Sequence, residues 1–112
     1  MDTTNIPLHD IELSETVVGR DILLLITGGA RHIGATSTAF VDGDHIKVLT
    51  SAIPNHKEHT LTEAIARKVA EALRRTVTVV MGIHYDNLSQ EGILQVVEVV
   101  DEKVNLYLLQ QI

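Results

Sequence analysis

The sequence predicts an α+β domain with an antiparallel sheet of about five strands and two helices, in the order ββββαβα. Apolar residues recur at strand spacing through the first half and at helical spacing in two later stretches. An Asp-Gly pair separates two of the strand-like runs. With 112 residues and a hydrophobic fraction of 45%, the chain can bury one core but is too short for two. We therefore expect a single domain over residues 1–112.

Four strands are expected in antiparallel succession in the first half. Residues 11–17 alternate between apolar and polar side chains, which is typical of a half-buried strand. Residues 21–26 are apolar without alternation, which predicts a central strand covered on both faces. Asp42-Gly43 predicts a tight hairpin between strands at 35–41 and 45–51, because Gly accepts positive φ and Asp tolerates it.

The second half predicts a helix, a strand and a terminal helix. The first helix is expected to start near residues 55–57, and residues 76–83 read as the fifth strand. Asp86, Asn87 and Ser89 offer N-cap chemistry for the second helix. That helix is apolar on two faces, so it is either deeply buried or one possible subunit interface. We expect a homodimer.

Composition excludes several classes of function. The formal net charge is −6 and the basic residues are mostly scattered, which argues against nucleic-acid binding. The chain has no cysteine, so disulfides and thiolate chemistry are excluded, in keeping with a reducing cytoplasm. No apolar run approaches the roughly 20 residues that span a bilayer, and the N-terminus lacks a signal pattern. We expect a soluble cytoplasmic protein without a membrane partner.

The first candidate site is a glycine-rich stretch after the second predicted strand. Gly28, Gly29 and Gly34 surround Arg31 and His32. The stretch is neither a P-loop, because no Gly-Lys-Ser/Thr follows, nor a dinucleotide fingerprint, because its spacing differs and a strand follows it. Backbone amides with an arginine could cradle an anion. The alternative is a connection that needs glycine only for a tight turn.

Two further polar segments follow strand-like runs. His56 and Lys57 lie at the expected helix start, where the helix dipole favours an anion. His84, Asp86 and Asn87 follow the fifth strand, so His84 could be a base oriented by Asp86. The alternative for His56 and Lys57 is a solvated loop, and a histidine at a strand end more often packs and donates one hydrogen bond than acts as a base. No metal-ligand spacing or nucleophile motif is present. Spacing alone predicts a small-anion or cofactor-binding module, or an interaction subunit.

In their order along the chain, the three polar segments resemble a known family. Residues 28–35 (GGARHIGA), 56–58 (HKE) and 82–87 (GIHYDN) are similar to the signatures of the prenylated flavin chaperones. That family includes the small D subunit associated with UbiD-type gallate decarboxylases, and its fold resembles that of the proteasome assembly chaperones. Arg31 stands where the family pattern usually has proline.

The resemblance implies a non-catalytic protein that binds prenylated FMN or FMN and supports a UbiD-type decarboxylase. It implies cofactor-binding roles for residues in all three segments, namely Gly28, Gly29, Arg31, His32, Gly34, His56, Lys57, His84, Asp86 and Asn87. The alternative is an assembly chaperone or interaction subunit that acts through protein contacts without a flavin.

Overall fold

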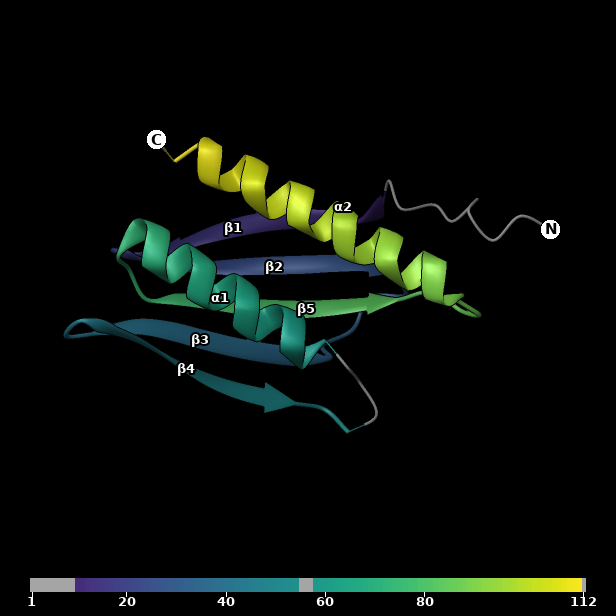
Figure 1. Cartoon of the computed structure of the whole chain (residues 1–112), viewed down its shortest axis with the longest axis horizontal. Coiled ribbons are helices and arrows are strands. Elements are labelled where there is room, and N and C mark those ends of the chain that lie inside the picture. Colours follow the sequence, from purple (N-terminus) through teal and green to yellow (C-terminus); the bar gives the residue numbers. More distant parts are fainter. Residues whose placement is uncertain (1–9, 55–57, 112) are drawn as a thin grey trace.

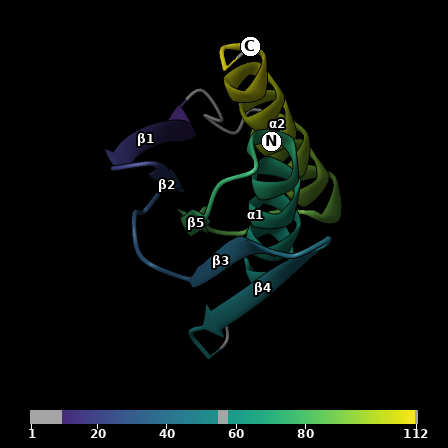
Figure 2. The same cartoon turned by 90° about the vertical axis from the view of Figure 1, so that its left-hand side faces the viewer.

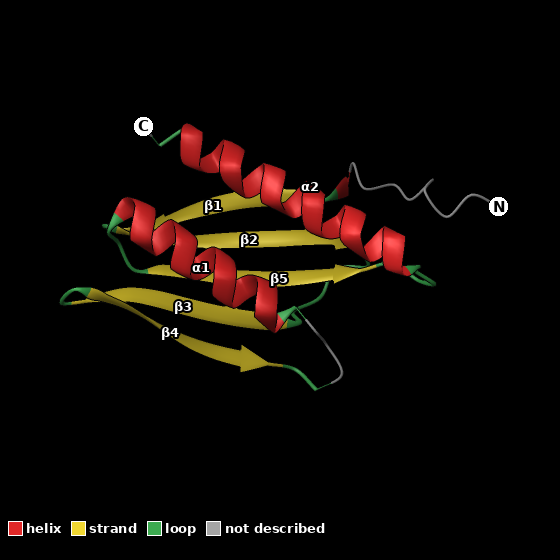
Figure 3. Cartoon of the chain, in the orientation of Figure 1, coloured by secondary structure: helices red, strands yellow, loops and turns green. Residues whose placement is uncertain are grey.

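A computed structural model describes residues 10–54 and 58–111 of the chain. It confirms the α+β class and the order ββββαβα (Figures 1 and 3). The elements are β1 (Glu12–Val18), β2 (Asp21–Gly29), β3 (Ala35–Asp42), β4 (His45–Ala52), α1 (His59–Leu73), β5 (Val77–His84) and α2 (Gln90–Leu109).

The strands form one five-stranded sheet in the order β1-β2-β5-β3-β4. The hairpins β1–β2 and β3–β4 are antiparallel, as predicted. The last strand, β5, lies between them, antiparallel to β3 but parallel to β2 (Figure 1). Strands β2 and β3 are therefore not neighbours, and the sheet contains one parallel pair. The parallel pair arises because α1 connects β4 to β5, and a strand–helix–strand connection returns the chain in its original direction. Strand β5 therefore runs in the same direction as β4 and β2.

The β3–β4 turn forms at the predicted Asp-Gly pair, and a second glycine turn joins β1 to β2. Gly19 and Gly43 adopt φ of 63° and 64°, in the left-handed region that glycine occupies without strain. The residue pairs next to these turns are Val18 with Asp21 and Asp42 with His45. The Asp-Gly pair thus fixes the β3–β4 register.

Both helices lie on one face of the sheet, and no described element covers the other (Figures 1 and 2). The aliphatic core fills the space between these layers, and its largest side chains include Ile11, Leu24, Ile26, Val79 and Met81. The residues of β2 that point away from the helices are not covered by any described element, and one of them, Leu25, is 38% exposed. The expectation that β2 is covered on both faces is therefore not met within the single chain.

The helices differ in how they begin. Helix α1 starts at His59, later than predicted, and no side chain caps it at Glu58. Residues 55–57, where the start was expected, lie outside the described part of the chain. Helix α2 starts as predicted after Ser89, whose hydroxyl accepts a hydrogen bond from the Gly92 amide at 3.0 Å.

Helix α2 buries one face and exposes the other. Val96, Val100 and Val104 pack on the core. Leu94 and Leu109 on the same helix are 64% and 65% exposed. The wide apolar sector of this helix is thus only partly used within the chain. Within residues 10–54 and 58–111, neither helix combines the length and apolarity required to cross a membrane.

A chain of buried hydroxyl groups links α1 to the β3–β4 hairpin. The Ser37 hydroxyl lies 2.7 Å from the hydroxyls of both Thr50 and Thr62. The Thr62 hydroxyl also donates to the His59 carbonyl at 3.1 Å. These bonds satisfy polar groups in the core and hold the first turn of α1 over the hairpin.

Replacing Ser37 with alanine removes the central member of this chain. We expect Ser37→Ala to lower the free energy of unfolding by about 1–2 kcal/mol, because it deprives the hydroxyls of Thr50 and Thr62 of a buried partner. Urea denaturation measures the loss. Ser51→Ala, an exposed serine of β4, is the matched control and should change stability by less than about 0.5 kcal/mol. Equal losses for the two variants would contradict this role.

Candidate functional site

The polar segments converge where β2 and β5 end. These strands are parallel, so their carboxyl ends lie at the same edge of the sheet. The connection from β2 to β3 crosses β5 at this edge and is held to it at both ends. The Ala30 amide donates to the His84 carbonyl at 3.0 Å, and the Gly34 amide donates to the Met81 carbonyl at 2.9 Å.

Glycine is required because the segments approach without room for side chains. A Cβ at Gly82 would lie 1.5 Å from the carbonyl oxygen of His32. One at Gly29, whose φ is +65°, would lie 2.0 Å from the carbonyl oxygen of His84, and one at Gly34 would lie 1.7 Å from a carboxylate oxygen of Glu58. Such distances are far below van der Waals contact. At Gly82 and Gly29 the opposing atoms are backbone, so these two glycines set the geometry of the site, whereas Gly34 faces the end of a flexible side chain.

Several amides of the glycine-rich stretch already have partners inside the chain. The Gly29 amide donates to Asp10 Oδ2 at 3.0 Å, and those of Ala30 and Gly34 donate to backbone carbonyls. They therefore do not form an open anion cradle in this conformation. The tight turn weighed from the sequence accounts for these glycines better than a nest of free amides does.

Three side chains from different elements meet beside this turn. The rings of His32 and His84 pack edge to face, with centroids 6.2 Å apart. His32 Nε2 lies 3.8 Å from Glu58 Oε1, and both of these side chains are largely buried, with 24% and 14% exposed. The other Glu58 carboxylate oxygen is buried without a hydrogen-bond partner in the described part of the chain. It is an acceptor that a ligand N–H or O–H could satisfy.

The His32–Glu58 pair lies between two hollows of different character. A polar hollow of about 310 Å³ is lined by Ala30, Arg31, His32 and His84. An apolar hollow of about 220 Å³ on the helix side is lined by Glu58 and aliphatic or thioether side chains, including Met81, Ile83 and Leu88. Imidazole and guanidinium groups suit an anionic or hydrogen-bonding ligand, whereas the second hollow suits an apolar ring.

The exposed residues at this edge are less constrained. His84 Nε2 lies 3.0 Å from Asp86 Oδ1, but the Asp86 side chain is 86% exposed. Arg31 faces Glu12 across 3.7 Å, and both of these side chains are mostly exposed. Exposed pairs contribute little stability. Asn87 adopts φ of 59°, so its position in the structure is that of a turn residue leading to α2.

Asp10 and Tyr85 make further contacts that hold the start of the glycine-rich turn in place. The Tyr85 hydroxyl donates to Asp10, which also accepts from the Gly29 amide. Burial raises the pKa of the Tyr85 hydroxyl above its ordinary value, and the Asp10 hydrogen bond and charge raise it further. Asp10 thus ties the start of β1 to the ends of β2 and β5.

The structure brings together most of the residues predicted from the sequence. Gly28, Gly29, Arg31, His32, Gly34, His84, Asp86 and Asn87 all lie at this edge. His56 and Lys57 fall outside the described residues. The site prediction omitted Glu58 and Asp10. Glu58 belongs to the second polar segment, whereas nothing near Asp10 in the sequence indicated its contacts.

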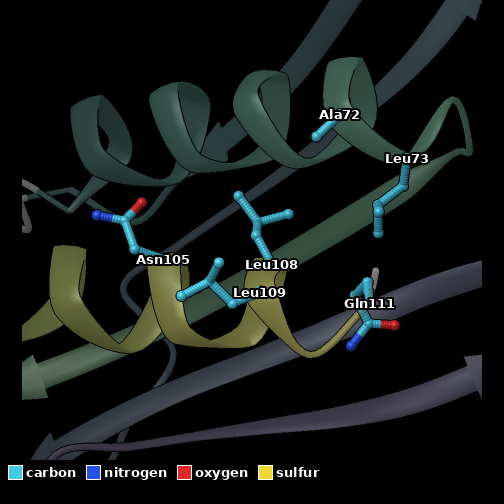
Figure 4. Close-up of a pocket in the computed structure, with 6 residues that line it drawn as sticks. All are labelled: Ala72, Leu73, Asn105, Leu108, Leu109 and Gln111. Atoms are coloured by element: carbon cyan, nitrogen blue, oxygen red, sulfur yellow. The ribbon is translucent and has the colours of Figure 1, made fainter.

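Other features of the molecule lie away from this edge. A larger cavity of about 580 Å³ separates the carboxyl-terminal ends of α1 and α2 and is lined by Ala72, Leu73, Asn105, Leu108, Leu109 and Gln111 (Figure 4). The described residues that line it include no titratable side chain, and it is distant from the polar segments. In the described ranges, no group of three or more His, Asp or Glu side chains is placed to hold a metal ion.

Comparison with known proteins identifies the family. The model of the prenylated flavin chaperone LpdD-like domain matches residues 6–112. The chain belongs to this family. The match includes the whole sheet, both helices and the three polar segments, so the resemblance of the segments extends over the domain.

A curated relative agrees with the family match. Protein LpdD of Lactiplantibacillus plantarum is 28% identical over 89 residues, which cover 77% of this chain. The matched region is 65% of the length of that relative. The chain therefore corresponds to somewhat less than two thirds of LpdD.

Gly82 provides a direct test of how the site is built. We expect Gly82→Ala to destabilise the fold by about 1–3 kcal/mol, because the new methyl group meets backbone atoms that cannot rotate away. Urea denaturation measures the loss, and histidine NMR signals should report displacement of His32 from His84. Gly43→Asn is the control, since Gly43 has open space and a φ that asparagine tolerates. Unchanged stability and histidine signals in Gly82→Ala would contradict the packing.

The raised pKa of Tyr85 predicts how stability depends on pH. A raised folded-state pKa contributes stability that is full below about pH 10 and is lost as pH rises through the folded value. We expect Tyr85→Phe to be less stable by about 1 kcal/mol at pH 7 and to lose stability less steeply above pH 10. Denaturation at several pH values measures both effects. A slope identical to that of the wild type would contradict the Asp10–Tyr85 contact.

Proposed function

We propose that this chain is a non-catalytic accessory protein that binds prenylated FMN, or FMN, and supports maturation of a UbiD-type aromatic acid decarboxylase. The observation that carries the proposal is the convergence of His32, His84 and Glu58 between a polar and an apolar hollow. A flavin nucleotide has the same division, with a phosphate and polar edge on one part and an extended ring on another. Membership in the prenylated flavin chaperone LpdD-like family supports this choice of ligand.

The residues at this edge fit such a ligand in part. Arg31, His32 and His84 would contact its anionic or polar groups, with Lys57 and His56 as further cations implied by the family resemblance. The buried oxygen of Glu58 would accept a hydrogen bond from a ring N–H. The two hollows contain no Phe or Trp for stacking in the described residues, so aliphatic packing must hold the ring.

The proposal includes no chemical step by this chain. His84 and Asp86 approach each other as a base and its orienting carboxylate would, but Asp86 is almost fully exposed and no nucleophile lies beside them in the described structure. We further propose that the protein acts in the cytoplasm as a homodimer, with the decarboxylase large subunit as its partner. The exposed leucines of α2 and the cavity beside them offer that partner an apolar contact surface.

Flavin binding tests the proposal directly. Titration calorimetry and flavin fluorescence with FMN and with prenylated FMN should both report binding to the wild-type protein. His32→Ala and His84→Ala should weaken it at least about tenfold, since each removes a group that lines the polar hollow. His45→Ala, an exposed histidine on β4 away from the site, is the matched control and should bind like the wild type.

Absence of heat and of a fluorescence change with both flavins would overturn the cofactor proposal. Equal capture of the decarboxylase subunit by the wild-type chain and by His32→Ala would then replace the cofactor proposal with the alternative of an assembly chaperone that acts through protein contacts. The exposed face of α2 is the observation that favours that alternative.

A further inference from the structure

We infer that the uncovered face of the sheet is the homodimer interface, where it packs against the same face of a second copy. This inference specifies the homodimer within the proposed function and is independent of flavin binding. It replaces the terminal helix as the subunit interface.

The uncovered face is unusual because its centre carries no charge. Residues in register form two rows that run across all five strands. One row is Ser14, Leu25, Val80, Thr36 and Ser51, and the other is Thr16, Leu23, Thr78, Thr38 and Leu49. A sheet face that remains in water normally carries polar and charged side chains at these alternate positions. The charged residues of this face lie instead toward the strand ends, at Glu12, Asp21, Asp42 and Lys47, and so do its histidines, His45 and His84.

The polar groups of these rows can be buried without large cost. Hydroxyls are the only polar side-chain groups in either row. The two at the centre, on Thr38 and Thr78, already hydrogen-bond each other at 2.8 Å. The apolar run of β2 has the same implication, because Leu23 and Leu25 belong to a continuous apolar strand of the kind that is covered on both faces. Within a single chain, only the face of β2 that is turned toward the helices is covered.

The shape of the face favours a second copy as its occupant. A two-fold axis parallel to the strands and centred on β5 would set β2 of one chain over β3 of the other. Leu25 and Leu23 would then lie opposite the smaller Thr36 and Thr38 of the partner, so that large side chains meet small ones. Such an axis makes the contact self-complementary, as in most homodimers.

The area of the face is that of a small specific interface. Five strands about 4.8 Å apart, each about 8 residues long at 3.3 Å per residue, present a face of about 600 Å². Two such faces bury at most about 1,200 Å², which is the lower bound for specific interfaces. The turn at residues 30–34 lies over Gly82 at one end of this face, so the partner must pack between that turn and the opposite strand ends.

Matched leucine variants distinguish this face from the helix. Leu49 on the sheet face and Leu94 on α2 are 66% and 64% exposed, so lysine at either position is compatible with a folded chain. Sedimentation velocity should give a mass of about twice 12.3 kDa for the wild-type chain and for Leu94→Lys. Leu49→Lys should weaken dimerisation at least about tenfold. Far-UV circular dichroism verifies that each variant is folded.

A charge pair tests the proposed axis. The axis sets Thr16 of β1 opposite Leu49 of the partner, whereas within one chain these residues lie on opposite edge strands. Thr16→Glu combined with Leu49→Lys should therefore restore the dimer that Leu49→Lys loses. If Leu49→Lys fails to fold, Thr16→Arg, at an exposed position of β1, takes its place in the comparison and should dissociate the dimer.

Three results would overturn the inference. They are a monomeric wild type at 100 micromolar, dissociation by Leu94→Lys but not by Leu49→Lys, and a dimer that no sheet-face variant weakens. If Thr16→Glu does not restore the dimer in the Leu49→Lys variant, the proposed two-fold axis is wrong. None of these results depends on flavin, so the cofactor proposal stands or fails separately.

Discussion

The close contact between the 30–34 turn and the end of β5 determines how the polar residues are arranged. The His32 carbonyl lies where a side chain at position 82 would be, and the His84 carbonyl lies where one at position 29 would be. Two hydrogen bonds from Ala30 and Gly34 hold the turn at this distance. Because backbone atoms rather than flexible side chains make the contact, His32 cannot move far from His84 without breaking the end of the sheet. The glycines therefore act as spacers for the histidines.

The carboxylate of Glu58 gives this edge its division into two environments. It lies near His32 on one side and lines an apolar hollow on the other, with one oxygen buried and unpaired in the described structure. Burying a polar group without a partner is unfavourable, and such groups are concentrated at functional sites. Acidic side chains outnumber the single arginine at this edge, so any strong preference for a phosphate must come from additional cations. Lys57 and His56, which precede Glu58, are the nearest in the sequence.

The two-layer architecture leaves the molecule with distinct surfaces. The helices cover one face of the sheet (Figure 2). Several leucines of α2 are exposed. The other sheet face has an uncharged centre and charged ends. The edge that carries the polar segments lies where these two faces meet, at the carboxyl ends of β2 and β5. The helix surface, the uncovered sheet face and the edge with the polar segments are therefore three different parts of the surface, although the 30–34 turn lies over one end of the sheet face.

The sequence alone determined the elements and their order, since periodicity, the Asp-Gly turn and the Ser89 cap are local signals. It did not determine every boundary, because α1 starts at His59, later than predicted, and has no side-chain cap. The sequence also determined which polar segments belong together, through their order along the chain. Only the tertiary structure decided that β5 lies between β2 and β3, because strand neighbours depend on how α1 crosses the sheet. The same applies to Glu58 and Asp10, whose contacts join residues far apart in the chain. The sequence also could not show that one face of β2 is left uncovered. An apolar strand indicates that both faces are buried but not what covers them.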